Sequence, residues 1–519
     1  MSRLNATRNI QTARSVTFWL APLMIALAPS LQSCQTSSSH HSSLANAGSD
    51  SPHPITELNS SVIAVGDSDW QSERCVQMVD RASKYKQSKI MFVPTLFWVQ
   101  TGDGPIDHYC YDRHQDSSGH FQCDAADDHK ILAFKNAMQR CFKRAIDAGL
   151  SIAVTPHLDD GTGQGRWRNI LNFDPLDKRS GYSYVDAVIY PIADALNAVA
   201  ADQTDIYFGM QGEMSATVFR HPSSWRSLIA TIKDRVGKDR STLFKGHIQV
   251  GVSTNFNKLC GCVGLDIVDP QEFVSQYPVL WQKVQGEFDL NEVAALFDAV
   301  DYVGMSSYPS LFPNFPTSEI ENAMSQFDFE FRFFGLSLQG LMQHGKKIHL
   351  SEYGVGGGSS QNGNVKASSA VDAAKFPFFG VFGAYSSGSD PWNPSDQSGS
   401  REVRDYRRYF YTKTLEYLRH ERAYKYRVDA AFLWDQSSWD IQGIYPESST
   451  SQGSFRDQAL VDLINQHNSD AMSGVVPKPE CTDVPPDATS SCSQQAAWNK
   501  CSEGFMQNYC DKSCGRCGH

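Results

Sequence analysis

Two glutamates are candidates for chemistry because each one ends an otherwise apolar run of the chain. The first run reads Tyr-Phe-Gly-Met-Gln-Gly before Glu213, and the second reads Ile-His-Leu-Ser before Glu352. Paired carboxyl groups can act as acid and as base or nucleophile when their surroundings push their pKa values apart. Alternatively, each of the two glutamates has a purely structural role, with its carboxylate held by a neighbouring arginine or a backbone amide.

Eight strand-like segments are available to position such a pair. Each is a nearly continuous apolar run bounded by polar loops, which is typical of strands buried on both faces of a parallel sheet. The predicted strands span residues 61–65, 90–98, 151–156, 206–210, 247–252, 302–306, 348–351 and 430–434. Glu213 and Glu352 lie at the ends of the fourth and the seventh.

Amphipathic stretches follow these strands along the chain. In one of them apolar residues recur at helical spacing until a glycine ends the pattern: Ile131, Phe134, Met138, Phe142, Ala145 and Gly149. The predicted helices span 73–85, 131–145, 185–199, 225–236, 292–299, 327–342, 403–418 and 455–464. Eight strands that each precede a helix predict an α/β fold, a (β/α)8 TIM barrel over residues 57–470. A doubly wound open sheet is the alternative, but no glycine-rich dinucleotide loop follows the first strand.

The positions of the two glutamates resemble those in the retaining glycoside hydrolases of clan A. In such barrels the chemistry lies at the carboxyl ends of the strands. By position, the resemblance implies that Glu213 is the acid/base and Glu352 the nucleophile, with their carboxyl groups about 5 to 5.5 Å apart. It also implies a higher pKa at Glu213. The implied activity is hydrolysis of O-glycosidic bonds in an oligo- or polysaccharide by double displacement, without a metal or an organic cofactor.

Further strand ends supply candidates for sugar binding. Tyr308 follows the sixth strand, where clan members commonly place a tyrosine against the nucleophile. Trp434 ends the eighth strand, where clan members often use a tryptophan as the floor of the sugar subsite. After the third strand, His157 and Asp159 are candidate contacts of sugar hydroxyl groups. The alternatives are core packing for the two aromatic residues and a hydrogen-bonded core position for the histidine.

One position departs from the pattern of the clan. Many of its families have an asparagine directly before the strand-four glutamate, where it contacts the 2-hydroxyl of the sugar. This chain has Gly212 there, preceded by Gln211. Either Gln211 takes over that contact or the 2-position is bound differently.

Several loops that follow the strands contain tryptophan. Rings on the rim would provide additional platforms for an oligosaccharide, whereas each ring could equally pin its own loop. Trp98 and Trp439 are candidates for substrate binding, and Trp167 and Trp392 are similarly placed.

The last 39 residues contain six of the thirteen cysteines: Cys481, Cys492, Cys501, Cys510, Cys514 and Cys517. A segment of this size cannot bury enough apolar surface to fold without cross-links. An even number of cysteines in an exported chain predicts three disulfides. The alternative is a zinc site formed by Cys510, Cys514, Cys517 and His519.

This segment resembles the ShK-toxin-like (ShKT) module over residues 481–517. The resemblance rests on Cys481-Thr-Asp, on Trp498 before a cysteine and on the close spacing of the last three cysteines. It implies three pairs, Cys481–Cys517, Cys492–Cys510 and Cys501–Cys514. Channel-blocking relatives have a Lys-Tyr pair where this chain has Asn508-Tyr509, so we favour an adhesion or spacer module over a toxin. The sequence does not identify its partner.

Six further cysteines lie in the predicted barrel: Cys75, Cys110, Cys123, Cys141, Cys260 and Cys262. We expect at least one local disulfide among them, with Cys110–Cys123 across a long loop as the best candidate. Cys260 and Cys262 are separated by a single glycine, and we expect this spacing to be too short for a mutual bridge.

The N-terminal end has the pattern of a secretory signal peptide over residues 1–33. Arginines precede an apolar run at 16–27, and small residues follow it. Leu31-Gln-Ser-Cys34 also resembles a lipoprotein cleavage box, so lipidation of Cys34 is an alternative. Residues 34–56 are a predicted disordered linker, and 471–480 form a second linker before the ShKT module. No later segment contains about 18 consecutive apolar residues, so we expect no transmembrane segment in the mature chain and a secreted or cell-surface protein.

Charge and composition limit the remaining function classes. The net charge is −11, and no basic run occurs anywhere, which argues against a nucleic-acid partner. A carbohydrate is the expected ligand. Two alternatives to a glycosidase remain: a catalytically inactive barrel that binds glycans, with the ShKT module for adhesion, and a toxin-like protein that acts through the module.

Overall fold

The computed structural model describes a large part of the chain in detail. The described residues are 54–71, 73–102, 104–255, 258–262, 270–359, 365–378, 390–392, 400–420, 424–435, 443–444, 455–474, 490–503, 506, 510 and 512–515. The chain divides into two units, Met1–Ser51 and Pro52–His519. The predicted signal peptide, the first linker to residue 53 and Cys34 lie outside the described residues.

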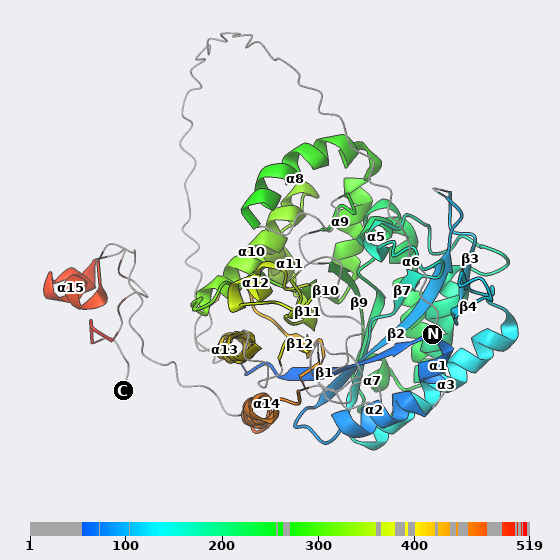
Figure 1. Ribbon diagram of the computed structural model, residues 1–519, viewed down its shortest axis with the longest axis horizontal. Coiled ribbons are helices and arrows are strands. Elements are labelled where there is room, and N and C mark those ends of the chain that lie inside the picture. The colour runs from blue at the N-terminus through cyan, green and yellow to red at the C-terminus, as the bar shows by residue number, and fades with distance from the viewer. Residues whose placement is uncertain are drawn as a thin grey trace, which may run out of the picture. The chain divides into compact units, whose positions relative to one another are not determined.

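Eight parallel strands close into a barrel (Figure 1). They are β1 (Leu58–Val65), β2 (Lys89–Val99), β6 (Ser151–Val154) with its continuation β7 (His157–Asp160), β8 (Ile206–Gly212), β9 (Ile248–Asn255), β10 (Tyr302–Ser307), β11 (Lys347–Tyr353) and β12 (Ala430–Leu433). The first strand pairs with both β2 and β12, and this double pairing closes the cylinder. The prediction of a (β/α)8 barrel is confirmed.

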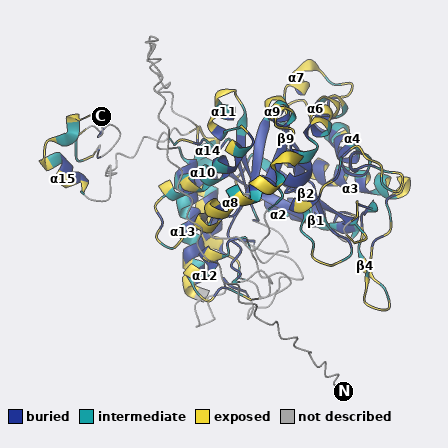
Figure 2. Cartoon of the chain, turned by 90° about the horizontal axis from the view of Figure 1, so that it is seen from above, coloured by how far each residue is buried: buried dark blue, intermediate teal, exposed yellow. Residues whose placement is uncertain are grey.

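Helices surround the barrel, and their outward faces carry the exposed residues (Figure 2). They are α1 (Gly66–Trp70), α2 (Arg74–Ala82), α3 (Asp128–Asp147), α4 (Tyr190–Val199), α5 (Ser215–Arg220), α6 (Pro222–Val236), α7 (Thr242–Lys245), α8 (Pro270–Val284), α9 (Leu290–Ala299), α10 (Ser318–Phe333), α11 (Leu338–Gln343), α12 (Ala370–Lys375), α13 (Ser400–Leu418) and α14 (Gln458–Met472). Short helical turns are η1 (Arg168–Ile170), η2 (Val185–Ile189) and η3 (Gln285–Glu287).

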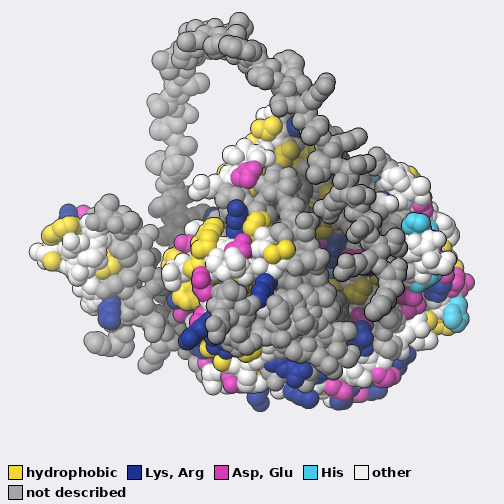
Figure 3. Space-filling model, in the orientation of Figure 1, with side chains coloured by type: hydrophobic (Ala, Val, Ile, Leu, Met, Phe, Trp, Pro, Cys, Tyr) yellow, Lys and Arg dark blue, Asp and Glu magenta, His cyan; other side chains and the backbone are white. Residues whose placement is uncertain are grey.

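Basic and acidic side chains are interspersed on the face shown in Figure 3. No helix within the described ranges combines the length and the apolarity that a membrane crossing requires.

The prediction of one helix over 327–342 is wrong. Gly335 adopts a left-handed conformation, with φ +73°, and the chain turns there after α10. The side chain of Ser337 then accepts a hydrogen bond from Gly340 N and begins α11. A left-handed glycine followed by a new N-cap residue therefore divides the amphipathic pattern into two helices.

Short strands extend the barrel on one side. β3 (His108–Cys110) pairs antiparallel with the end of β2, and β4 (His114–Gln115) pairs with β5 (Phe121–Gln122) in a small hairpin. The predicted Cys110–Cys123 disulfide ties this segment together and is confirmed.

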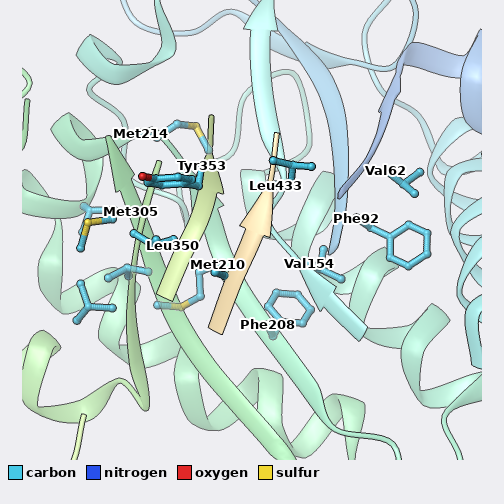
Figure 4. Packing of buried hydrophobic residues seen from close by; sticks show 14 of the residues in the cluster. Val62, Phe92, Val154, Phe208, Met210, Met214, Met305, Leu350, Tyr353 and Leu433 are labelled. Atoms are coloured by element: carbon cyan, nitrogen blue, oxygen red, sulfur yellow. The ribbon is translucent and has the colours of Figure 1, made fainter. Parts of the chain in front are cut away.

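Residues along each strand alternate between the inside of the barrel and the helical layer. Met91 and Val93 of β2 pack inside, together with Tyr207 and Tyr302. Their neighbours on β2, including Trp98, belong to the outer core against the helices, part of which appears in Figure 4. Trp98 is fully buried there, so its prediction as a substrate-binding residue is wrong. Position 98 lies within β2, and because side chains alternate along a strand, an even-numbered position next to the inward-facing Met91 and Val93 series points its indole toward the helices.

Glycines on β9 and β10 make room inside the barrel. A Cβ atom at Gly251 would lie 2.6 Å from the ring of Tyr302, and one at Gly304 would collide with the hydroxyl groups of Ser253 and Ser351. These two hydroxyl groups lie 2.8 Å apart and hydrogen-bond across the barrel. The interior is therefore wide enough only for the smallest residues at these positions.

The C-terminal segment contains α15 (Cys492–Ala497) and η5 (Lys500–Ser502). Ser491 and Gln494 form a capping box that begins α15. Two disulfides are present, Cys492–Cys510 and Cys501–Cys514, as the ShKT resemblance implies. They exclude the zinc alternative, because two of its three thiols are oxidised. Cys481 and Cys517 lie outside the described residues.

Two further disulfides join barrel cysteines. Cys75–Cys141 links α2 to α3. Cys260 and Cys262 are bridged to each other, so the expectation that they are too close is wrong. Gly261 between them has φ +59°, and its left-handed turn places the two Cα atoms 5.1 Å apart, within the range of about 4.4–6.8 Å that a disulfide requires.

We expect Gly304→Ala to lower the free energy of unfolding by about 1–3 kcal/mol, because the added methyl group overpacks the barrel interior. Urea denaturation followed by circular dichroism measures the change. The control is Gly286→Ala, because a Cβ atom at Gly286 meets nothing within 4 Å. Equal unfolding free energies for the two variants would contradict the packing argument.

Candidate active site

Glu213 and Glu352 lie at the carboxyl ends of β8 and β11, and each is only 2% exposed. The β8–β9 pairing changes register between Gly209 and Gly212, just before Glu213. The β10–β11 pairing also changes register, and Ser306 is opposite Glu352 there. Such irregularities redirect side chains at the rim of a barrel. The predicted catalytic pair therefore projects from two irregular strand ends.

Glu213 is held by its backbone and by its carboxyl group. Its φ of +59° is uncommon for a residue with a side chain, and its N–H donates to the carbonyl oxygen of Ser253. Asn255 Nδ2 donates to Glu213 Oε1 at 2.9 Å. Arg168 Nε lies 3.7 Å from Oε2. One carboxyl oxygen thus accepts a hydrogen bond from an amide, and the other lies near the guanidinium group of Arg168.

Glu352 has a polar neighbour at each carboxyl oxygen. Tyr308 donates its hydroxyl hydrogen to Oε2 at 3.1 Å, at the position that the sequence predicts. His157 Nε2 lies 2.9 Å from Oε1, within hydrogen-bonding distance, although the contact is not aligned as a hydrogen bond. Hydrogen bonds at catalytic groups often align fully only when substrate is present. The Tyr308 hydroxyl group favours the charged form of Glu352, against the effect of its burial.

Arg168 connects the two glutamates. Its Nη2 donates to His157 Nδ1 at 2.9 Å, and its Nη1 lies 3.2 Å from Asp159 Oδ1. Neither Arg168 nor Asn255 is predicted from the sequence. Nothing in a loop after a strand indicates which of its basic residues will turn inward, and the fold alone makes that selection.

Burial and, after it, the negative charge of Glu352 raise the pKa of Glu213 to about 7, whereas Arg168 opposes the shift. Burial also raises the pKa of Glu352 to about 7, but Arg168 and the hydrogen bond from Tyr308 favour its charged form. With one proton for the pair, we place it on Glu213. Burial and the nearby charge of Arg168 lower the pKa of His157 to about 3, so its imidazole is neutral.

The aromatic candidates differ in their positions. Trp434 is half-buried, and its ring stacks on that of His157 with centroids 6.0 Å apart. Trp167 packs against Phe378. Trp392 is fully buried beneath the guanidinium of Arg407 and is not a rim residue.

The remaining predicted site residues lie as follows. Asp159 is half-buried beside Arg168. Gln211 is fully buried, and its side-chain oxygen accepts a hydrogen bond from Met214 N at 2.8 Å, so it supports the turn that presents Glu213. Trp439 lies outside the described residues. Within the described ranges, no three His, Cys, Asp or Glu side chains are grouped to hold a metal ion.

A buried carboxyl group anchors the loop that follows β9. Glu330 of α10 accepts a hydrogen bond from Leu259 N at 2.7 Å. Asn169 donates to the carbonyl oxygen of Lys258 and accepts from Ser215 N, which joins this loop to the segment after Glu213. Burial raises the pKa of Glu330 to about 8.

Comparison with known proteins does not assign the chain to a family. No family model matches the chain, and no curated protein is similar to it. Among solved structures, a GH113 β-1,4-mannanase is 14% identical, with a TM-score of 0.42 over 80% of this chain and 99% of its own. A GH113 β-mannanase from Alicyclobacillus acidocaldarius is 13% identical, with a TM-score of 0.43 over 81% and 98%. An Ignisphaera aggregans GH53 catalytic domain is 11% identical, with a TM-score of 0.37 over 80% and 99%.

We expect Glu330→Gln to flatten the pH dependence of stability. A carboxyl group with a raised pKa in the folded state stabilises the fold fully below its unfolded pKa of about 4.3, and this contribution is lost as pH rises toward 8. The slope for one proton is about 1.4 kcal/mol per pH unit. Urea unfolding at pH 5 and pH 8 measures it, with the surface variant Glu292→Gln as control. A slope unchanged from that of the unmodified protein would contradict the assignment.

Proposed function

We propose that the protein is a secreted retaining β-glycosidase or glycanase that hydrolyses O-glycosidic bonds of an oligo- or polysaccharide. The observation that carries this proposal is the contrast between two buried carboxyl groups at the ends of β8 and β11. Glu352 has a neutral donor near each oxygen, whereas Glu213 has the charge of Glu352 nearby, which adds to burial in favouring its protonated form. This is the division of roles that double displacement requires.

In the first step Glu352 attacks the anomeric carbon, and the bond from that carbon to the leaving oxygen breaks. Glu213 transfers its proton to the leaving oxygen, so the departing group leaves as an alcohol. A covalent glycosyl ester on Glu352 results, and Glu213 becomes a carboxylate. The positive charge of Arg168, 3.7 Å from Glu213 Oε2, stabilises that carboxylate until the second step.

In the second step a water molecule attacks the anomeric carbon while Glu213 takes its proton. The ester bond breaks, Glu352 leaves as a carboxylate, and the product retains its anomeric configuration. Both glutamates return to their starting protonation states. The two carboxyl groups supply the acid, the base and the nucleophile, so the proposed reaction uses no cofactor.

The substrate class follows from the side chains around this pair. Trp434 is half-buried and provides an aromatic face against which the apolar side of a sugar ring can pack. Asp159 is half-buried and can accept hydrogen bonds from hydroxyl groups. A neutral carbohydrate satisfies both kinds of contact, as the sequence predicts.

Oxidised cysteines support export. Five disulfides occur among the residues that the structure describes, three in the barrel and two in the C-terminal segment. Such bonds persist in oxidising compartments. We therefore propose a secreted or cell-surface enzyme whose ShKT-like segment serves as an attached adhesion or spacer module.

We expect Glu352→Ala to reduce hydrolysis of β-glycosides by more than about 10,000-fold, because the nucleophile is lost. Glu213→Ala should cost about 100- to 10,000-fold on substrates whose leaving group needs protonation. A panel of aryl β-glycosides and β-glycans measures both effects, and azide should restore turnover to Glu352→Ala by replacing the nucleophile.

The control for these variants is Glu292→Ala, on the outer helix α9, which should retain full activity. If the unmodified protein binds a glycan but cleaves none, the proposal fails, and an inactive glycan-binding barrel replaces it.

The pH profile gives an independent test. Because Glu213 must be protonated in the first step, kcat/KM should fall as pH rises through about 7. In Glu213→Ala, assayed with an aryl leaving group that needs no proton, this decline should disappear. A decline that persists unchanged in the variant would assign it to another group.

A further inference from the structure

Gly212, directly before Glu213, has no side chain because its space is already occupied. A Cβ atom there would lie 2.5 Å from His157 Nε2 and 2.6 Å from Thr155 Cγ2. Contacts this short do not occur in folded proteins, so one group would have to move. The φ of Gly212 is not in the left-handed region, so its backbone conformation does not require glycine. The requirement for glycine comes from the imidazole of His157 together with the methyl group of Thr155.

His157 is fixed by neighbours on several sides. Arg168 Nη2 donates to Nδ1 at 2.9 Å, the ring stacks on Trp434, and only 1% of the residue is exposed. Arginine is a donor only, so Nδ1 must be the acceptor. In a neutral imidazole the hydrogen is then on Nε2, which lies 2.9 Å from Glu352 Oε1.

We propose that His157 is a positioning residue for Glu352: Arg168 fixes its Nε2–H tautomer, and the missing side chain at Gly212 leaves room for the ring. This inference rests on the proposed function, because it assigns His157 to the nucleophile. It also replaces the prediction that His157 contacts a sugar hydroxyl group.

The arrangement suits a nucleophile. Tyr308 donates to Oε2, and Nε2 of the neutral His157 lies 2.9 Å from Oε1. Once the second contact aligns with substrate bound, two neutral donors define the plane of the carboxylate. A neutral donor orients the group without forming an ion pair that would compete with the anomeric carbon. The cationic group, Arg168, acts on Glu352 from behind the imidazole. A displacement of about 1 Å at a reacting group can cost about 100-fold in rate.

Positions 157 and 212 should therefore be coupled. Gly212→Asn would force a side chain into the volume of the imidazole and displace it. When His157→Ala empties that volume, the amide of the introduced asparagine can enter it and supply an N–H to Glu352. Alanine at both positions empties the same space but supplies no donor.

The test compares kcat and KM on a cleaved β-glycoside for the variants Gly212→Asn, His157→Ala, Gly212→Asn/His157→Ala and Gly212→Ala/His157→Ala. We expect each single variant to lose about 100-fold in kcat, with a smaller change in KM. The Asn/Ala double variant should recover at least about 10-fold over His157→Ala, and the Ala/Ala variant should not. Gly286→Asn, at an open position, is the matched control and should keep full activity.

Two outcomes would overturn the proposal. Full activity of Gly212→Asn would show that the imidazole need not occupy this space. Equal recovery in the Asn/Ala and Ala/Ala variants, or no recovery in either, would show that a donor at this position does not orient the nucleophile.

A spectroscopic measurement tests the tautomer without substrate. Nitrogen chemical shifts of ¹⁵N-histidine in the unmodified protein, assigned with His157→Gln, distinguish the two tautomers from the charged form. We expect neutral His157 with Nε2–H across pH 5 to 8. An Nδ1–H tautomer or a charged ring in an active enzyme refutes this inference alone, whereas absence of all hydrolysis refutes the proposed function.

Discussion

The charge of Arg168 is the interaction on which the arrangement of the site depends. Two carboxyl groups that are each 2% exposed cannot both ionise at low energy without a nearby cation. Arg168 supplies that cation without neutralising either glutamate directly. It lies 3.7 Å from Glu213 and donates to His157, and its charge favours the ionised form of Glu352. We therefore propose that the pair holds one proton, with Glu213 as its carrier.

The room for this arrangement comes from small residues in the barrel. Gly251 and Gly304 keep the interior clear beside Tyr302 and the paired serines, and Gly212 clears the space that His157 fills. Close packing makes these positions sensitive to a single added methyl group. The catalytic geometry is thus a property of the barrel wall as well as of the loops above it.

Loops after the strands complete the site, and cross-links and buried polar groups hold them. The Cys260–Cys262 bridge and the anchoring of Leu259 by Glu330 restrain the loop after β9. Asn255 at the end of that strand donates to the proposed acid/base. The C-terminal segment likewise depends on disulfides, with Met506 buried between them. Oxidation is therefore part of the stability of both regions.

The sequence by itself determined the barrel, because each strand is a local apolar run and each helix a local amphipathic pattern. It also located Glu213, Glu352, Tyr308 and Trp434, since each directly ends or follows such a run. Tertiary structure alone decided which groups surround them. Arg168 and Asn255 reach Glu213 from separate loops and strands, and no local pattern records a contact across 42 or more residues. The position of Trp98 along β2 decided that its side chain points toward the helices. The absence of a side chain at Gly212 left room for the imidazole of His157.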